Sequence, residues 1–276
     1  MQQPKGTLFV VATPIGNLAD MSFRGLEVLG SADVIACEDT RHTAKLLNHY
    51  KIKKRTLSYH EHNERERSDE LISILTNGGT VALVSDAGTP AINDPGSLLI
   101  KKAIDSDIRV VPVPGPAAFV TAVIVSGLPT DSIFFGGFLP ARTGERRRRL
   151  QEIANIPATL VLYETPVRLA RALADCLDIL GDRPAAAARE LTKIHEEVVR
   201  GTINSLIEHF SSAKPKGEFV LVFDRAGAGK SASDDLLSSR IDELIAEGIP
   251  QRKAIKTAAK EFGISRSEAN RRLQGS

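Results

Sequence analysis

The chain has 276 residues, of which 42% are hydrophobic and 25% are charged, with a formal net charge of +2. This composition is ordinary for a globular protein with a sizeable core, and it excludes fibrous and disordered chains. The length exceeds one typical domain, so two domains, or two domains and a small module, are expected. Because the net charge is small, any binding of nucleic acid has to come from local clusters.

Two features bear on the cellular location. The sequence has no apolar stretch near the 18 residues that a membrane-spanning helix needs, and its amino terminus lacks the basic start and cleavage site of a secretory signal. Cys37 and Cys176 lie in unrelated segments, which is typical of reduced thiols rather than of a disulfide framework. We therefore expect a cytoplasmic protein with no membrane contact.

In chain order, short runs of β-branched and apolar residues alternate with segments of helical spacing. The alternation predicts α/β layers with a largely parallel sheet. The predicted strands are 7–12, 34–36, 81–84, 110–113, 159–163 and 219–223. Helical spacing is clear at 71–75, 98–103 and 169–177.

Changes in composition predict the domain boundaries. A stretch rich in Gly and Pro at 112–116 separates an amino-terminal α/β domain, residues 1–116, from a second α/β domain, residues 117–225. Small and polar residues then predict a linker at 226–235, followed by a helical module at 236–276.

Three predicted strands end in loops rich in Gly and Pro, at 13–17, 85–90 and 114–118. In parallel α/β sheets, ligands bind at the carboxyl ends of strands, where loops expose backbone groups. Glycine lets the main chain approach a ligand closely, and proline stiffens the approach. Any one of these loops could be an ordinary tight turn, but three at corresponding ends predict one shared pocket, with Asp86 available for a cationic or hydroxyl group.

Seven ordered motifs carry a resemblance to a known family: TPIGNLADMS, CEDTRHT, SDAGTPAINDPG, VPVPGPAA, GFLP, YETPVR and RELTK. They resemble the tetrapyrrole methylase superfamily of S-adenosylmethionine-dependent methyltransferases, and within it the group that acts on small-subunit ribosomal RNA. The resemblance implies two α/β domains of the class III methyltransferase type with the cofactor cleft between them. It also implies a homodimer and methylation of a cytidine ribose 2′-oxygen in 16S rRNA of the small ribosomal subunit.

The same resemblance implies where S-adenosylmethionine binds. The loop at 86–88 would lie against its methionine part, and residues of the second domain would flank the adenine. For Tyr163, a role as a core residue at a strand end remains open. The implied cofactor residues are Pro14, Ile15, Asp86, Ala87, Gly88, Gly115, Ala117, Ala118, Tyr163 and Ala188.

A ribose hydroxyl is barely ionised at neutral pH, so a base is considered. The candidates for catalysis are Asp39, Arg41, Glu190 and Lys193, with Glu38 as a second carboxylate beside Asp39. His60 and His62 are further candidates for a base or a phosphate contact. Each could instead be a salt-bridged or solvated charge, and Arg41 and Lys193 could equally hold RNA phosphates. The His-x-His pair has no third ligand at a recognisable spacing, so no metal site is predicted.

Two basic clusters stand out. Five arginines lie within 142–149, where a phosphate-contacting rim and a solvated helix start are both open interpretations. In 251–273, seven basic residues face two acidic ones. This tail resembles a helix-turn-helix with a second helix capped by Ser265, and we expect it to bind rRNA, with a packing or dimerisation helix pair as the alternative.

Two other functions stay open. A small-molecule methyltransferase acting on a tetrapyrrole is one, although a porphyrinoid site would not need the basic clusters. The other is a non-enzymatic regulator that reads nucleic acid through its tail and senses a ligand in the cleft.

Overall fold

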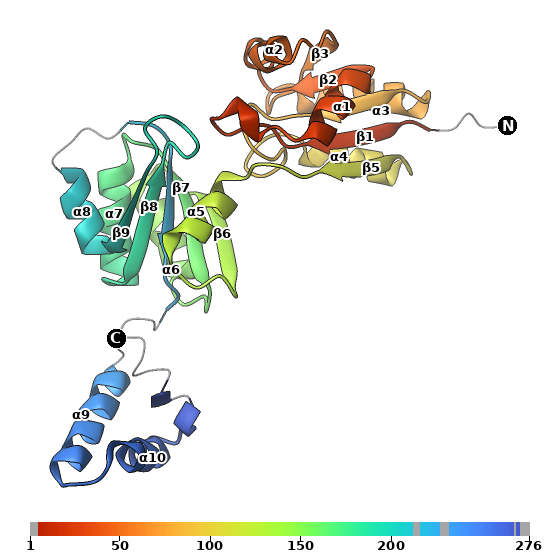
Figure 1. The fold of residues 1–276 in the computed structure, drawn as a ribbon. Coiled ribbons are helices and arrows are strands. Elements are labelled where there is room, and N and C mark those ends of the chain that lie inside the picture. Colours follow the sequence, from red (N-terminus) through yellow and green to blue (C-terminus); the bar gives the residue numbers. More distant parts are fainter. Residues whose placement is uncertain (1–4, 212–215, 227–231, 268, 271–276) are drawn as a thin grey trace.

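The computed structural model describes residues 5–211, 216–226, 232–267 and 269–270. Two α/β units, each built around a five-stranded sheet, are followed by a helical part (Figure 1). The chain passes from the first sheet to the second through the segment between β5 (Arg109–Val113) and α5 (Ala118–Ser126).

The first sheet is parallel throughout, with the strand order β3-β2-β4-β1-β5. Its short apolar strands are buried because helices cover both faces. Besides β5, they are β1 (Thr7–Val11), β2 (Val34–Cys37), β3 (Arg55–Ser58) and β4 (Thr80–Leu83).

The helices of this unit divide between the two faces of the sheet. A short 3₁₀ helix, η1 (Leu18–Asp20), precedes α1 (Phe23–Ser31), which packs with α2 (Thr40–His49) on one face. On the other face lie α3 (Glu64–Thr76) and α4 (Ser97–Asp105). The neighbours β1 and β4 are followed by helices on opposite faces, which is the arrangement at which ligands bind beyond the carboxyl ends of parallel strands.

The second sheet has the order β6-β7-β10-β8-β9, and only its β6–β7 pair is parallel. The prediction of a largely parallel sheet is therefore right for the first unit and wrong for the second. Here β8 and β9 follow each other without a crossover helix, so they pair antiparallel. The strands are β6 (Ile133–Phe138), β7 (Thr159–Glu164), β8 (Pro184–Arg189), β9 (Glu197–Thr202) and β10 (Phe219–Phe223).

Three helices pack on one face of the second sheet: α6 (Thr143–Ile153), α7 (Leu169–Leu180) and α8 (Ile203–Ser211). Among the described elements, only α5 contributes a helix to the core on the other face, through Ala122 and Val123. Its outward side chains Val120 and Ile124 are 46% and 69% exposed.

The carboxy-terminal part consists of α9 (Ala232–Ala246) and α10 (Gln251–Glu261), which pack on each other around Leu237, Ile241 and Ala258. A further helical segment begins at residue 266, after the turn that the sequence predicts. The predicted linker is shorter than expected, since α9 begins at Ala232; residues 227–231 lie outside the described ones. In the part of the chain that the structure describes, no helix is long and apolar enough to cross a membrane.

Candidate active-site cleft

Backbone hydrogen bonds join the three loops rich in Gly and Pro at one edge of the first sheet. Thr13 and Gly88 pair through both amides, with N···O distances of 2.8 and 3.0 Å. The hydroxyl of Thr89 donates to the carbonyl of Pro116 at 3.2 Å, which attaches the third loop. The prediction that these loops converge is confirmed.

The loop between β4 and α4 is irregular because four of its residues have left-handed backbones. Their φ angles are 81° at Gly88, 66° at Ala91, 60° at Asn93 and 141° at Gly96. Such angles interrupt both strand and helix, and Ala and Asn adopt them only at some cost in free energy. The result is a loop whose Asp86, Asn93 and Asp94 all line the cavity described below.

Tyr163, at the end of β7, connects the second domain to this edge. Its hydroxyl accepts a hydrogen bond from the amide of Phe119 at 3.3 Å, near the start of α5, where the capping residue Ala117 provides no side-chain acceptor. Phe135 and Phe138 lie edge-on to the ring, with centroids at 5.0 and 5.4 Å. Burial raises the pKa of Tyr163 to about 12, so the phenol stays protonated at neutral pH.

The two domains touch where the β1 loop meets the loop after β8. The amide of Asn17 donates to the hydroxyl of Thr192 at 3.0 Å. A Cβ on Gly16 would lie 2.5 Å from Cγ of Lys193, so this close approach requires glycine. Glu190 and Thr192 have φ angles of 50° and 66°, and strained backbone of this kind concentrates at functional sites.

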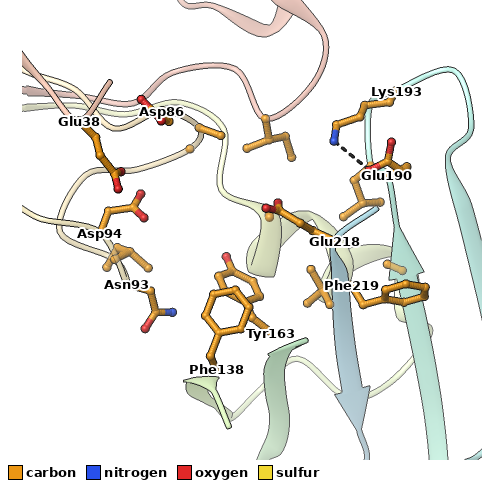
Figure 2. A pocket seen from close by; sticks show the side chains of 18 residues that line it. Glu38, Asp86, Asn93, Asp94, Phe138, Tyr163, Glu190, Lys193, Glu218 and Phe219 are labelled. Carbon is orange, nitrogen blue, oxygen red and sulfur yellow. Dashed lines mark hydrogen bonds and ion pairs between the residues drawn. The ribbon is translucent and has the colours of Figure 1, made fainter. Parts of the chain in front are cut away.

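Between the domains lies a cavity of about 280 Å³ lined by residues of both (Figure 2). Of the expected cofactor residues, those that line it are Ile15, Asp86, Ala87, Gly88, Ala118, Tyr163 and Ala188. Pro14, Gly115 and Ala117 do not line it. Gly115 instead lets two loops pack, because a Cβ there would lie 3.0 Å from that of Ala12.

The four candidate catalytic residues separate into two pairs. Glu190 and Lys193 line the cavity and form an ion pair, with Oε1 and Nζ 2.9 Å apart. Asp39 and Arg41 do not line it. Asp39 caps α2, accepting from the Arg41 amide at 2.8 Å and from its guanidinium at 3.0 Å, and these hydrogen bonds lower the pKa of Asp39 to about 2.

The two histidines of the His-x-His pair contact each other edge-on, with centroids 6.0 Å apart, and His60 Nε2 lies 3.2 Å from the side-chain nitrogen of Asn63. Neither histidine lines the cavity. Among the described residues, no group of three or more His, Cys, Asp or Glu side chains is placed to hold a metal ion.

Sequence reasoning missed several cavity residues, chiefly Asn93, Asp94, Phe138 and Glu218. Of the two neighbouring carboxylates considered from the sequence, Glu38 lines the cavity and Asp39 does not. Asn93 and Asp94 belong to a motif already singled out, but neither was chosen as a site residue. Only the turn of each loop decides which neighbour faces the cleft. Phe138 likewise lies in the quoted GFLP motif, and no motif or spacing marks Glu218.

Carboxylates dominate the electrostatics of the cavity. Among the described residues that line it, Lys193 is the one basic side chain, against Glu38, Asp86, Asp94, Glu190 and Glu218. Burial raises the pKa of Asp94 to about 6, and the neighbouring carboxylates act in the same direction. Burial also raises the pKa of Glu38. With Tyr163 and Phe138 forming an aromatic wall, the cavity suits a ligand with a cationic part and a flat ring.

The arginine run at the start of α6 is mainly structural. Arg146 has a side chain only 3% exposed, and its Nε donates to Asp175 at 2.7 Å. Arg147 also bonds Asp175 at 3.0 Å, and the arginines at 142 and 149 pair with glutamates one turn away. Within the described chain, Arg148 is the member of the run without an ion pair, and Arg146 is too deeply buried to contact a phosphate.

Comparison with known proteins shows the family to which this chain belongs. The family model of the tetrapyrrole (corrin/porphyrin) methylases matches residues 7–207. A protein of Mesorhizobium japonicum, named ribosomal RNA small subunit methyltransferase I, is 47% identical over 96% of this chain and 90% of its own. A protein of the same name from Halalkalibacterium halodurans is 46% identical over 96% of this chain and 93% of its own.

Solved structures agree on the fold. Diphthine synthase superposes with a TM-score of 0.62 over 79% of this chain and 90% of its own, at 17% identity. Uroporphyrin-III-C-methyltransferase from Thermus thermophilus gives 0.58 over 79% and 94%, at 19% identity. With a family model covering most of the chain and relatives close to half identical over nearly all of it, this protein belongs to the tetrapyrrole methylase family.

Proposed function

We propose that this chain is a methyltransferase that uses S-adenosylmethionine to methylate ribosomal RNA of the small subunit. The carrying observation is the cleft, in which seven of the ten expected cofactor residues line one cavity between two domains. S-adenosylmethionine supplies a methyl group on a positively charged sulfur, which makes it an activated donor. The acidic lining suits its sulfonium and ammonium groups, and the wall around Tyr163, Ala188 and Val220 suits its adenine.

The substrate proposal rests on the relatives, several of which carry the name ribosomal RNA small subunit methyltransferase I. We place the methyl group on the 2′-oxygen of a cytidine ribose in 16S rRNA, and the enzyme in the cytoplasm with the ribosome. Because the donor is already activated, positioning of the two reactants can supply much of the catalysis, up to roughly 7–11 kcal/mol. The close contact between Gly16 and the 191–193 loop keeps the two halves of the cleft together for this purpose.

The carboxy-terminal module offers a surface for RNA. One face of α10 is buried against α9, and the opposite face exposes Arg252, Lys253, Lys256 and Lys260. Among the described residues none of these four forms an ion pair, whereas Arg240 of α9 pairs with Glu243 and Glu261. An unpaired stripe of cations along one helix fits a phosphate backbone.

The exposed face of α5 supports a homodimer. The helix is apolar on nearly all sides, and Val120 and Ile124 remain open to solvent in the single chain. A helix that is hydrophobic all round is normally buried, and a second copy of this chain would cover it. The start of the same helix lines the cleft through Ala118, so dimer formation would stabilise a wall of the site.

Transfer of labelled methyl groups tests the proposed reaction. Small subunits from a strain lacking this gene, incubated with the protein and labelled S-adenosylmethionine, should incorporate label into 16S rRNA. A 2′-O-methyl group blocks alkaline cleavage at its own nucleotide, so the label should appear in an alkali-resistant dinucleotide that begins with cytidine. Label in a single nucleotide would overturn the ribose assignment, and label in a precorrin with none in rRNA would favour a tetrapyrrole substrate.

A further inference from the structure

The proposed reaction removes a proton from a ribose hydroxyl, yet two of the acidic groups considered from the sequence, Asp39 and Glu190, are already engaged. Asp39 accepts from the amide and the guanidinium of Arg41 outside the cavity. Glu190 is held by Lys193. A carboxylate that is paired with a cation is a weaker proton acceptor than one that is not.

Two other carboxylates have the geometry that the task requires. Glu38 follows β2, and Asp94 belongs to the loop that follows β4, so different segments carry them to the same wall of the cavity. Figure 2 shows their carboxyl groups pointing toward each other, across the cavity from Glu190 and Lys193. In the part of the chain that the structure describes, neither Glu38 nor Asp94 forms an ion pair.

The surroundings of the pair are mostly acidic. Asp86 faces both members, and Asp39 adds negative charge beside Glu38. His60, in contrast, lowers the pKa of Glu38.

Asp94 has Glu218 of the second domain as a further acidic neighbour, and the nearby Ser85 hydroxyl acts in the opposite direction on its pKa. Close carboxylates in a partly buried site share protons, because both cannot ionise without repulsion. Such a pair is suited to take up one proton near neutral pH.

We propose that Glu38 and Asp94 form the carboxyl pair that accepts the proton of the ribose 2′-hydroxyl during methyl transfer. The inference rests on the proposed function and adds the identity of its base. The proton moves from the ribose oxygen to a carboxylate oxygen of the pair, and a lone pair of that ribose oxygen forms the new bond to the methyl carbon. The electrons of the carbon–sulfur bond stay on sulfur, which leaves as a neutral thioether, and the pair later releases its proton to solvent.

Single-turnover methyl transfer to deficient small subunits, at saturating cofactor, is the first test. Glu38→Gln and Asp94→Asn should each lower the rate by about 10²-fold or more, the usual share of a general base. In the wild-type protein the logarithm of the rate should rise with pH to a plateau, and Asp94→Asn should remove that inflection. Asp105→Asn, on the outer surface of α4, is the matched control and should keep both the rate and the profile.

The second test needs neither cofactor nor rRNA. Carbon-13 NMR titration of side-chain carboxyls in the unliganded protein should show Asp94 titrating above the ordinary range of aspartate. Glu38→Gln should move that titration to lower pH, because it removes a neighbouring negative charge, and Asp105→Asn should leave it in place. An Asp94 titration unaffected by Glu38→Gln would show that the two groups do not act as a pair and would overturn the inference.

Failure of this inference differs from failure of the proposed function. If wild-type protein places no label in rRNA, the function itself is wrong. If wild-type protein labels rRNA while Glu38→Gln and Asp94→Asn keep its rate and pH profile, the function stands and the base is wrong. Calorimetric binding of S-adenosylmethionine completes the comparison: variants that bind weakly but react at the wild-type rate when saturated would make the pair a cofactor contact and overturn its role as base.

Discussion

Arg146 shows how a charged residue in a basic run can belong to the core. Its guanidinium contacts Asp175 and also donates to the carbonyl of Ala141 at 3.1 Å, while Asp175 is only 12% exposed. Burial of this kind is tolerated only when the charges are paired and their hydrogen bonds are satisfied. The run that appears in the sequence as one basic patch therefore contains residues with different tasks.

Replacing Arg146 by alanine should strongly destabilise the protein. The change removes one of the two arginines that neutralise the buried charge of Asp175, and breaking a buried pair costs about 3–5 kcal/mol. Because Arg147 still bonds Asp175, we expect a loss near the lower end of this range. Urea unfolding measures the loss. Arg148→Ala, which removes an exposed side chain of the same helix, should change the free energy of unfolding by less than about 0.5 kcal/mol. Equal effects of the two changes would contradict the buried pair.

Asp94 should make the stability of the protein depend on pH in a defined direction. Its pKa rises from 3.8 to about 6 in the folded state, so the folded protein binds the proton more tightly than the unfolded chain. The stabilisation from this group is fully present below about pH 4 and is lost as the pH rises through about 6. Ionised Asp94 therefore lowers the free energy of unfolding, as residues at functional sites commonly do.

Asp94→Asn should consequently stabilise the protein at pH 8, by about 1 kcal/mol once the partial exposure of the carboxyl is taken into account. The difference from wild type, measured by urea unfolding, should shrink toward zero near pH 4. Comparing the two proteins at each pH cancels the titration of all other groups. A difference that stays constant between pH 4 and 8 would show that Asp94 titrates normally.

At the scale of elements, α5 is the helix whose surroundings are incomplete. It packs on β7, β8 and β10 through one side, and its opposite side exposes Val120 and Ile124. Ile104, on α4, is 59% exposed as an isolated apolar side chain. Scattered exposure of that kind is normal, whereas a continuous apolar helix face marks an interface.

Ile124→Glu should therefore shift the proposed dimer to monomer. A charge placed in the centre of an apolar interface costs several kcal/mol when it is buried without a partner. Sedimentation velocity at micromolar concentration measures the change, and Ile104→Glu is the matched control that should leave the dimer intact. A wild-type protein that sediments as a monomer, or an Ile124→Glu variant that remains dimeric, would exclude this face as the interface.

The strands show which elements a local pattern can predict. All six predicted strands are present, and their ends are within one residue of the expected ones. Four strands were missed, and β8, with four consecutive alanines, shows why: alanine has little intrinsic preference for strands. Its alanines are buried between helices on both faces, so tertiary packing and not propensity makes this segment a strand.

At the scale of the whole molecule, α9 and α10 form a small core of their own, apart from the two sheets (Figure 1). The exposed lysines of α10 at 253, 256 and 260 follow the spacing of one helix stripe. Each phosphate contact releases a bound counterion, so the number of contacts sets how steeply binding falls with salt.

Changing Lys253, Lys256 and Lys260 together to glutamine should weaken binding to small subunits and reduce the slope of log affinity against log salt by about 2–3. Affinity for S-adenosylmethionine should stay the same, because no residue of α10 lines the cavity. The matched control changes the same three residues to arginine, which keeps the charge and should keep the slope. An unchanged slope in the glutamine variant would remove α10 from the RNA contact.

The sequence by itself determined the α/β class, the loops that carry the site and the family resemblance. These features depend on short-range patterns: apolar runs, glycines and prolines at strand ends, and ordered motifs. Only the tertiary structure decided that β8 to β10 pair antiparallel, that Arg146 is buried, and that Glu38 and Asp94 rather than Asp39 face the cleft. Such outcomes depend on the direction in which each loop turns and on which distant segment packs against it, and neighbouring residues in the chain do not specify either.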